Sequence, residues 1–282
     1  MCRKLLILSL LLLPVLESGK SHALPGEESA YERVLRTGKL RCGYALWPLY
    51  VDKDPNSGKL SGIFVDYLKE LGESAQLEVE WKEEINFSDI AEVLRSNRVD
   101  AICSGAWTNP VRGKFVDFVT PIFYQTVSAF VRAGDRRFDE ELERLNSENI
   151  VISVVDGESA STIAENDFPR AKRLSMPKGT ENAQMLLNVI HGKADVAFAD
   201  AALAGAFIEH NPGMLRAVPV KFPLRVFGAP LIIKKDEGAL KTTLDTATEQ
   251  LLWTGRIENI LRKYEKLHGM FLRAKKPFEG ES

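Results

Sequence analysis

Arg112 lies at a position in the sequence where a protein could bind a carboxylate. Residues 99–103 form a short apolar, strand-like run, a small-residue loop follows at 104–106, and Arg112 comes after the turn at 109–110. The planar guanidinium group of arginine can bind a carboxylate through two parallel hydrogen bonds. From the residues alone, the alternative is a surface ion pair between Arg112 and Asp117 or a glutamate.

The loop before this arginine could contact the same ligand. It contains Ser104 and Gly105, and a glycine lets another group approach the backbone closely. Trp107 follows and either walls a pocket with its large apolar face or packs near a hinge. Further aromatic walls could come from one earlier loop, which carries Tyr44, Trp47 and Tyr50. A strand, an exposed backbone loop and a fixed cation together indicate a site for a small carboxylate.

Two other strand ends carry acidic or hydroxyl residues. A predicted helix begins after Gly157, with Glu158 and Ser159 at its start. The free N–H groups of a helix N-terminus attract anions, so Ser159 could help to bind one or could simply be the N-cap. Asp200 ends a second apolar strand and is suited to cap the helix that follows it.

The composition indicates a globular protein without a nucleic-acid partner. Of 282 residues, 45% are apolar and 27% are charged, and the formal net charge is −2. A generally basic face is therefore not expected. The 4 histidines have no metal-ligand spacing, and the chain has neither a G-x-S-x-G elbow nor a P-loop. We expect no metal, no cofactor and no catalytic residue.

Residues 1–23 have the pattern of a secretory signal peptide. Arg3 and Lys4 precede an apolar core at 5–16, which is too short to span a membrane comfortably, and small residues at 21 and 23 suit cleavage. A buried N-terminal helix is the alternative. No cysteine follows the apolar core, so we expect no lipid anchor and predict export to a bacterial periplasm.

Two cysteines, Cys42 and Cys103, follow this segment, each near the end of a predicted strand. An oxidising compartment permits a disulfide between them, although its geometry is restrictive. Two buried free thiols are equally compatible with the sequence.

The order of predicted elements indicates an α/β protein. A strand at 40–45, a helix from residue 63, a strand at 77–82 and a helix capped by Ser88 lead to the strand at 99–103. This alternation argues for a mostly parallel sheet flanked by helices.

A similar alternation returns in the second half, where one helix is predicted to begin at a Thr180 cap. The segment before residue 105 and the segment before residue 200 also share a pattern. In each, a helix ends, an aspartate follows (Asp100 or Asp195), and an apolar strand leads to a break. We interpret this as two similar lobes, with chance recurrence of a common βαβ unit as the alternative.

Together these motifs resemble the extracellular solute-binding proteins of family 3, the amino-acid-binding partners of ABC importers. The likeness extends over residues 30–268. Its pieces are LSGIFVDYLKELGE, VDAICSGAWTNPVRGKFVDFVTPIFY, VVDGES, GKADVAFAD and LLWTGRIENILRKY. Three residues depart from the family pattern: Phe64 where an acid is usual, Trp107 where a small hydroxyl residue is common, and Glu158 where threonine is usual.

The resemblance implies a two-lobe fold like that of type II periplasmic binding proteins. Two strands would cross between the lobes near 124–125 and 227–228. Lobe 1 would comprise 24–124 and 228–282, and lobe 2 would comprise 125–227. The ligand would be enclosed by a hinge motion.

The resemblance also implies a role for each of several residues in the cleft. Arg112 would bind the ligand carboxylate, Asp200 would bind the ligand ammonium, and Ser159 would serve both as cap and as ligand contact. Glu158 would repel a carboxylate unless it points away, or it could reach a cationic ligand group.

The implied function is capture of a small amino acid, or a related zwitterion or carboxylate, by a monomer that delivers it to an ABC transporter permease in the inner membrane. Two alternatives stay open. A periplasmic cyclohexadienyl-dehydratase-like enzyme could use Glu158 as its acid, and a soluble sensor could report the ligand to a receptor. The identity of the ligand is open.

Overall fold

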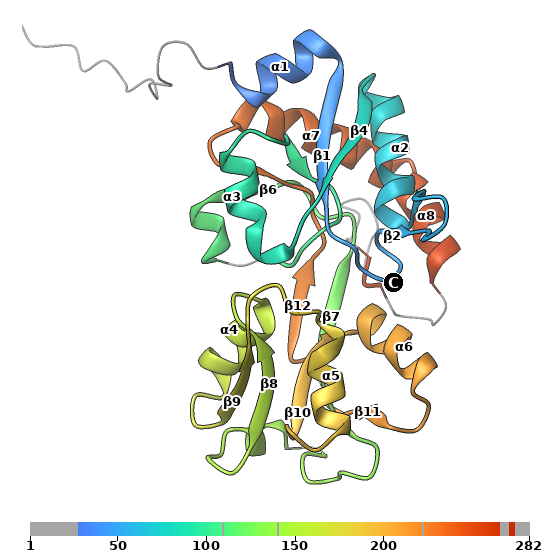
Figure 1. The fold of residues 1–282 in the computed structure, drawn as a ribbon. Coiled ribbons are helices and arrows are strands. Elements are labelled where there is room, and N and C mark those ends of the chain that lie inside the picture. Colours follow the sequence, from blue (N-terminus) through green and yellow to red (C-terminus); the bar gives the residue numbers. More distant parts are fainter. Residues whose placement is uncertain (1–27, 109, 140, 222, 266–270, 274–282) are drawn as a thin grey trace, which may run out of the picture.

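The structure, a computed structural model, describes residues 28–108, 110–139, 141–221, 223–265 and 271–273. The predicted signal segment 1–23 lies outside these residues, as do residues 274–282 of the predicted first lobe. The chain forms two α/β lobes, which lie one above the other in Figure 1.

The first lobe is built on a five-stranded sheet with the strand order β4-β1-β5-β13-β6. The bounds are β4 Glu78–Glu84, β1 Lys39–Tyr44, β5 Ala101–Ile102, β13 Ile232–Lys234 and β6 Val116–Phe118. A two-stranded ribbon, β2 Asp52–Lys53 and β3 Leu60–Ser61, accompanies it.

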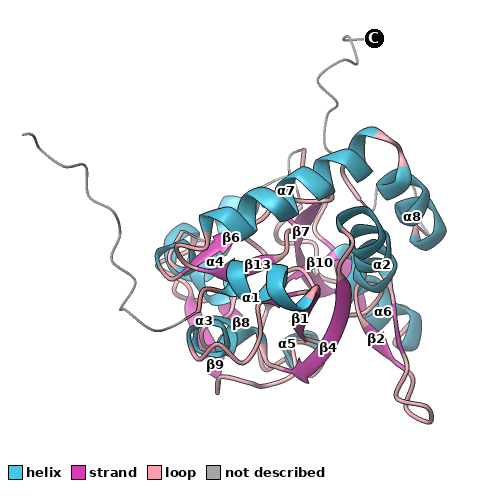
Figure 2. Cartoon of the chain, turned by 90° about the horizontal axis from the view of Figure 1, so that it is seen from above, coloured by secondary structure: helices cyan, strands magenta, loops and turns pink. Residues whose placement is uncertain are grey.

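The helices of this lobe are α1 Ala30–Thr37, α2 Ile63–Ala75, α3 Ile90–Arg95, α7 Gly238–Trp253 and α8 Arg256–Tyr264, with short 3-10 turns η1 Phe87–Asp89 and η2 Arg112–Lys114. Local sequence explains the ends of α1, where a capping box joins Ser29 and Glu32 and Gly38 adopts the left-handed conformation. The helices α2, α7 and α8 pack against one another, as seen from above in Figure 2.

The second lobe has a sheet with the order β11-β7-β10-β8-β9, and β12 also pairs with β7. Its strands are β7 Tyr124–Arg132, β8 Val151–Val155, β9 Lys172–Met176, β10 Val196–Asp200, β11 Leu215–Ala217 and β12 Arg225–Gly228. Its helices are α4 Ser159–Asp167, α5 Ala183–Ile190 and α6 Ala201–His210, with a 3-10 turn η3 Leu142–Leu145.

The strands β7 and β12 run between the lobes (Figure 1). They pair in antiparallel fashion at their lobe-1 ends, where Gly228 is opposite Tyr124 and Phe227 is opposite Gln125. The connection is reinforced from lobe 1, because the Tyr50 hydroxyl donates to the Gln125 side-chain oxygen and both residues are buried.

Both sheets are mixed, which corrects the prediction that each is mostly parallel. The strand β1 pairs in parallel with β4 and β5, and β8 pairs in parallel with β9 and β10. In contrast, β13 runs antiparallel to β5 and β6, and β7 runs antiparallel to β10, β11 and β12. Because the chain crosses between the lobes twice, these strands enter the sheets in the opposite direction.

Two predicted helix caps are also wrong. Asp89 precedes α3, and the Ser88 hydroxyl instead donates to the Asp89 carboxylate. Asn182 precedes α5, and the Thr180 hydroxyl instead donates to the Pro177 carbonyl.

Cys42 and Cys103 form a disulfide, with their Cα atoms 5.5 Å apart. It joins β1 to the residue after β5 within the core of the first lobe, and both residues are fully buried. Of the two possibilities left open by the sequence, the structure contains the disulfide.

Candidate ligand-binding site

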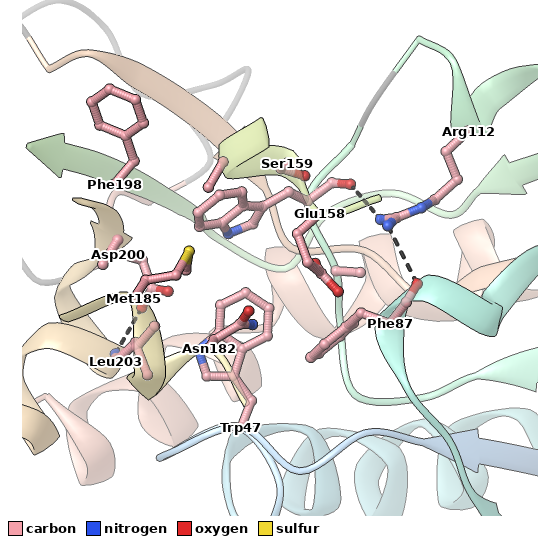
Figure 3. Close-up of a pocket in the computed structure, with 14 residues that line it drawn as sticks. Trp47, Phe87, Arg112, Glu158, Ser159, Asn182, Met185, Phe198, Asp200 and Leu203 are labelled. Atoms are coloured by element: carbon pink, nitrogen blue, oxygen red, sulfur yellow. Dashed lines mark hydrogen bonds between the residues drawn. The ribbon is translucent and has the colours of Figure 1, made fainter. Parts of the chain in front are cut away.

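A cavity of about 30 Å³ lies between the two lobes and takes its walls from both. The first lobe supplies Trp47, Phe87, Ala106, Trp107 and Arg112, and the second supplies Glu158, Ser159, Ala160, Asn182, Met185, Phe198, Ala199, Asp200 and Leu203 (Figure 3). Because one water molecule needs roughly 10–15 Å³ of such space, a ligand the size of an amino acid enters only if the walls part.

Arg112 reaches the cavity from η2, at the turn that the sequence indicated. Its two terminal guanidinium nitrogens donate to the carbonyl oxygens of Trp107 and Phe87 over 3.3 and 3.4 Å. Burial lowers the pKa of Arg112, and the nearby charge of Glu158 opposes this effect. An arginine remains protonated under such conditions, so the cavity contains a fixed positive charge.

Glu158, and not Ser159, is the N-cap residue of α4. Its backbone is extended and its side chain makes no capping hydrogen bond, which leaves the carboxylate directed into the cleft (Figure 3). Burial raises the pKa of this carboxyl group, while Arg112 and Lys178 lower it. Ser159 is the first helical residue, is buried and lines the cavity. The Ser161 N–H donates to the Glu158 carbonyl, so the N–H groups of Ser159 and Ala160 are the ones that this helix start could offer to an acceptor.

Asp200 combines the capping role with an available acceptor. Its Oδ1 accepts from the backbone N–H groups of Ala202 and Leu203 over 2.8 and 3.0 Å. Its Oδ2 is buried without a hydrogen-bond partner among the described residues. Burial raises the pKa of Asp200 to about 6, although the backbone N–H groups lower it. Capping by one oxygen therefore leaves the other facing the cavity.

Aromatic rings form much of the first-lobe wall. The ring of Trp47 lies 4.9 Å from that of Phe87 and 5.8 Å from that of Trp107, and Trp107 stacks on Phe227 at 4.9 Å. The indole N–H groups of Trp47 and Trp107 are buried without a hydrogen-bond partner in the described part of the chain. The Trp47 N–H is nevertheless close enough to Asp200 to lower its pKa slightly.

Buried polar groups without partners are uncommon in proteins and suggest a missing ligand group. The cavity has two such donors, the indole N–H groups, and two such acceptors, Asp200 Oδ2 and Asn182 Oδ1. The site can therefore bind a molecule that has both hydrogen-bond donors and acceptors.

Six of the residues predicted from sequence line the cavity: Trp47, Trp107, Arg112, Glu158, Ser159 and Asp200. Three others do not line it. The Ser104 hydroxyl accepts from the Ala45 N–H, Gly105 packs against the Phe64 ring, and Tyr44 packs edge-on against Trp81. Tyr50, the other aromatic considered, is buried against the hinge strands.

Phe87 and Asn182 are among the cavity-lining residues that the sequence did not indicate. Asn182 had a usable signal, because asparagine is at least as common as threonine at helix N-caps and lies two residues after Thr180. Phe87 lies in a short 3-10 turn with no distinctive pattern.

The described residues contain no group of three or more histidine, cysteine, aspartate or glutamate side chains arranged to hold a metal ion. Among the same residues, no helix has the length and apolar character needed to cross a membrane.

Comparison with known proteins identifies the family. The chain belongs to the bacterial extracellular solute-binding proteins, family 3, whose family model matches residues 41–266. The amino-acid-binding protein AabA of Dichelobacter nodosus is 24% identical over 220 residues, which cover 76% of this chain and 82% of AabA.

Two further likenesses agree with this assignment. The protein named "Probable ABC transporter extracellular-binding protein YckB" of Bacillus subtilis (strain 168) is 28% identical over 189 residues, covering 65% of this chain and 62% of YckB. The fold matches the crystal structure of the ancestral amino acid-binding protein AncCDT-1, a precursor of cyclohexadienyl dehydratase, with a TM-score of 0.72 and 22% identity over 85% of this chain and 100% of that one.

Proposed function

We propose that this solute-binding protein captures a small amino acid, or a related zwitterion or carboxylate, between its lobes and delivers it to an ABC importer. The observation that carries the proposal is that Arg112 from one lobe and Asp200 from the other line the same cavity. Opposite charges on opposite lobes suit a zwitterion. The names of AabA and YckB, which refer to amino-acid binding and to an ABC transporter, support the same class of ligand and partner.

The ligand carboxylate would bind to the Arg112 guanidinium group and to the first-turn N–H groups of α4 beside Ser159. The ligand ammonium would donate to Asp200 Oδ2, which has no hydrogen-bond partner among the described residues. The rings of Trp47 and Trp107 would cover the rest of the ligand, and their N–H groups would donate to its oxygens. Asp200 Oδ2 and the two indole N–H groups would then have partners.

Capture would occur by hinge motion about residues 124–125 and 227–228, where β7 and β12 pair. In this proposal, residues 24–124 and 228–282 move as one lobe and 125–227 as the other. Only a ligand that contacts both lobes stabilises the closed arrangement, because a ligand shifts a conformational equilibrium by its differential affinity for the two states.

In its biological setting, the protein would be a monomer without a cofactor that binds its ligand without turnover. Residues 1–23 would direct export to the periplasm and would be removed. The closed protein would then dock on the permease in the inner membrane. These assignments follow from the signal-like sequence and from the family of extracellular binding proteins.

A calorimetric and thermal-shift screen over amino acids, organic acids and sugars would test the proposal. We expect at least one amino acid or close analogue to raise the melting temperature, and Arg112→Ala to abolish this shift while the apo protein stays folded. Arg173→Ala is a matched control, because Arg173 lies on β9 in an exposed pair with Glu165. Stabilisation by sugars alone, or unchanged affinity in Arg112→Ala, would contradict the proposal.

A second candidate function is suggested by Glu158. Its carboxyl group faces the cavity and burial raises its pKa, as an acid catalyst requires. The similar fold of AncCDT-1 is described as a precursor of cyclohexadienyl dehydratase. Incubation with prephenate or arogenate distinguishes the two functions: product above background that is lost in Glu158→Gln would favour the enzyme.

A further inference from the structure

Three charged side chains line the cavity in the described structure: Arg112, Glu158 and Asp200. When all three are ionised, one negative charge is left without a balancing positive charge. Building on the proposed function, we propose that the ligand carries a net positive charge and that Glu158 determines this specificity by pairing with a second cationic group of the ligand.

Glu158 is positioned to do this by its place in the fold. As the N-cap residue of α4 it has an extended backbone, and its side chain makes no hydrogen bond to the helix. The carboxylate is therefore available to the cavity, where Figure 3 shows it on the side of Arg112 and Phe87. The neighbouring pair of Lys178 and Asp89 lies outside the cavity lining, and its two charges balance each other.

The charge balance disfavours two classes of ligand. A ligand with net negative charge would add to the unbalanced charge of the site. A neutral zwitterion would pair with Arg112 and Asp200 and would offer no cationic group of its own to the Glu158 carboxylate, which leaves the net negative charge of the site in a cavity shielded from water. A ligand with two cationic groups and one carboxylate offers an opposite charge to each of the three charged side chains.

The walls of the cavity suit the same ligand. Trp47, Phe87 and Trp107 present aromatic rings, and cations are attracted to ring faces. Asn182 Oδ1 and Asp200 Oδ2 accept hydrogen bonds but have no donor among the described residues, while the two indole N–H groups require an acceptor such as a carboxylate. A short diamino acid supplies ammonium donors and a carboxylate acceptor together.

Calorimetry at pH 8 with matched ligands tests the proposal. Ornithine and lysine would be compared with glutamine and norleucine, which are neutral and of similar length, and with putrescine, which lacks the carboxylate. We expect the diamino acids to bind roughly tenfold or more tightly than the neutral amino acids. In Glu158→Gln, the ratio should fall to about one, because cationic ligands lose affinity and neutral ones do not.

Glu165→Gln is the matched control, because Glu165 is exposed on the same helix and its removal changes the charge of α4 without touching the cavity. The control should preserve the ratio. If neutral amino acids bind as tightly as diamino acids, or if Glu158→Gln leaves the ratio unchanged, the charge inference is wrong and the proposed function stands.

Putrescine binding as tightly as ornithine would support the charge inference but would remove the carboxylate-binding role of Arg112. Failure of every amino acid and amine to bind would overturn the proposed function and, with it, this inference.

Discussion

Lys178 Nζ lies 3.0 Å from Asp89 Oδ1, which joins the loop after β9 in the second lobe to η1 in the first. The pair lies across the cleft and close enough to Glu158 for both charges to affect the pKa of that residue. It is about half exposed, with side-chain exposures of 52% and 37%, so its energy is modest. Because its two residues belong to different lobes, the pair forms only when the lobes are close together.

Lys178→Gln should weaken ligand binding by roughly 1.4- to fivefold at low salt, because an exposed ion pair contributes about 0.2–1 kcal/mol. Salt screens such pairs, so the difference should vanish near 1 M NaCl. Calorimetry at both salt concentrations measures the effect. Lys172→Gln, an exposed lysine on β9, should leave the affinity unchanged. Equal affinity of Lys178→Gln and wild type at low salt would show that the pair has no part in closure.

Ligand affinity should rise as the pH increases from about 5 to 7, because the pKa of Asp200 is about 6 and an ammonium group binds to its ionised form. Tyr50 is the titratable neighbour of Asp200, and burial raises the pKa of its hydroxyl well above the usual range, so it stays protonated. Asp200→Asn should lose about a hundredfold or more in affinity, and its remaining affinity should depend less on pH in this window than that of the wild type.

The free energy of unfolding should fall over the pH range in which ligand affinity rises. The folded state holds the Asp200 proton more tightly than the unfolded chain, whose aspartates titrate near 4. The stability that this group contributes is thus fully present below about pH 4 and is lost as the pH rises through about 6. Asp200→Asn keeps an oxygen to cap α6 and should not share this decline. Chemical denaturation at pH 4.5 and 7 compares the two proteins, and a parallel decline in both would contradict the assignment.

Gly105→Ala should destabilise the fold without removing a ligand contact. Gly105 has φ +68, and a Cβ there would overlap the Phe64 ring. We expect a loss of about 2 kcal/mol or more, which corresponds to a fall of roughly 4–8 °C in melting temperature. Gly157→Ala is the control, because Gly157 also has a positive φ but no atom lies within 4 Å of its Cβ position. If Gly105→Ala binds ligand weakly while keeping its melting temperature, Gly105 belongs to the ligand site after all.

Removal of the disulfide should also lower stability. Cys42 and Cys103 are separated by 61 residues in sequence, and a crosslink over such a loop contributes about 3–4 kcal/mol through the unfolded state. The double variant Cys42→Ala/Cys103→Ala should therefore melt roughly 6–12 °C lower. Scanning calorimetry with and without reductant measures this. Reductant should have no effect on the variant, and an unchanged melting temperature would contradict the expected contribution.

Local patterns were sufficient to predict most of the elements. The three- and four-residue apolar spacing from residue 63 predicted α2, and the alternation of Leu77, Val79 and Trp81 predicted β4. Each of these two elements differs from its prediction by no more than a few residues, because the spacing of the apolar residues reflects which face of the element is buried. The same reasoning could not predict strand direction, which depends on how the chain returns between the lobes.

The first residues of α3 and α5 could not be predicted from cap preferences. Ser88 and Thr180 are good caps by type, but a capping bond is worth only about 1 kcal/mol. The helices instead begin at Ile90 and Ala183, where packing buries Val93 and Leu94 of α3 and Met185 and Leu186 of α5. Burial of such side chains contributes about 1.5–3 kcal/mol each, so it outweighs the cap preference.

By itself, the sequence determined the kinds of groups that this protein can offer a ligand: a cation after one strand, acids after two others, and aromatic residues in the loops. It also determined the family, because the motifs that contain these groups resemble the motifs of the family and follow one another in the same order. Only the tertiary structure decided which groups meet. Arg112, Glu158 and Asp200 come from separate segments and face one cavity, whereas Ser104, Gly105 and Tyr44 pack inside the first lobe. The physical reason is that adjacent residues of an extended chain point to opposite sides, so the packing of the two lobes selects which side chains reach the cleft.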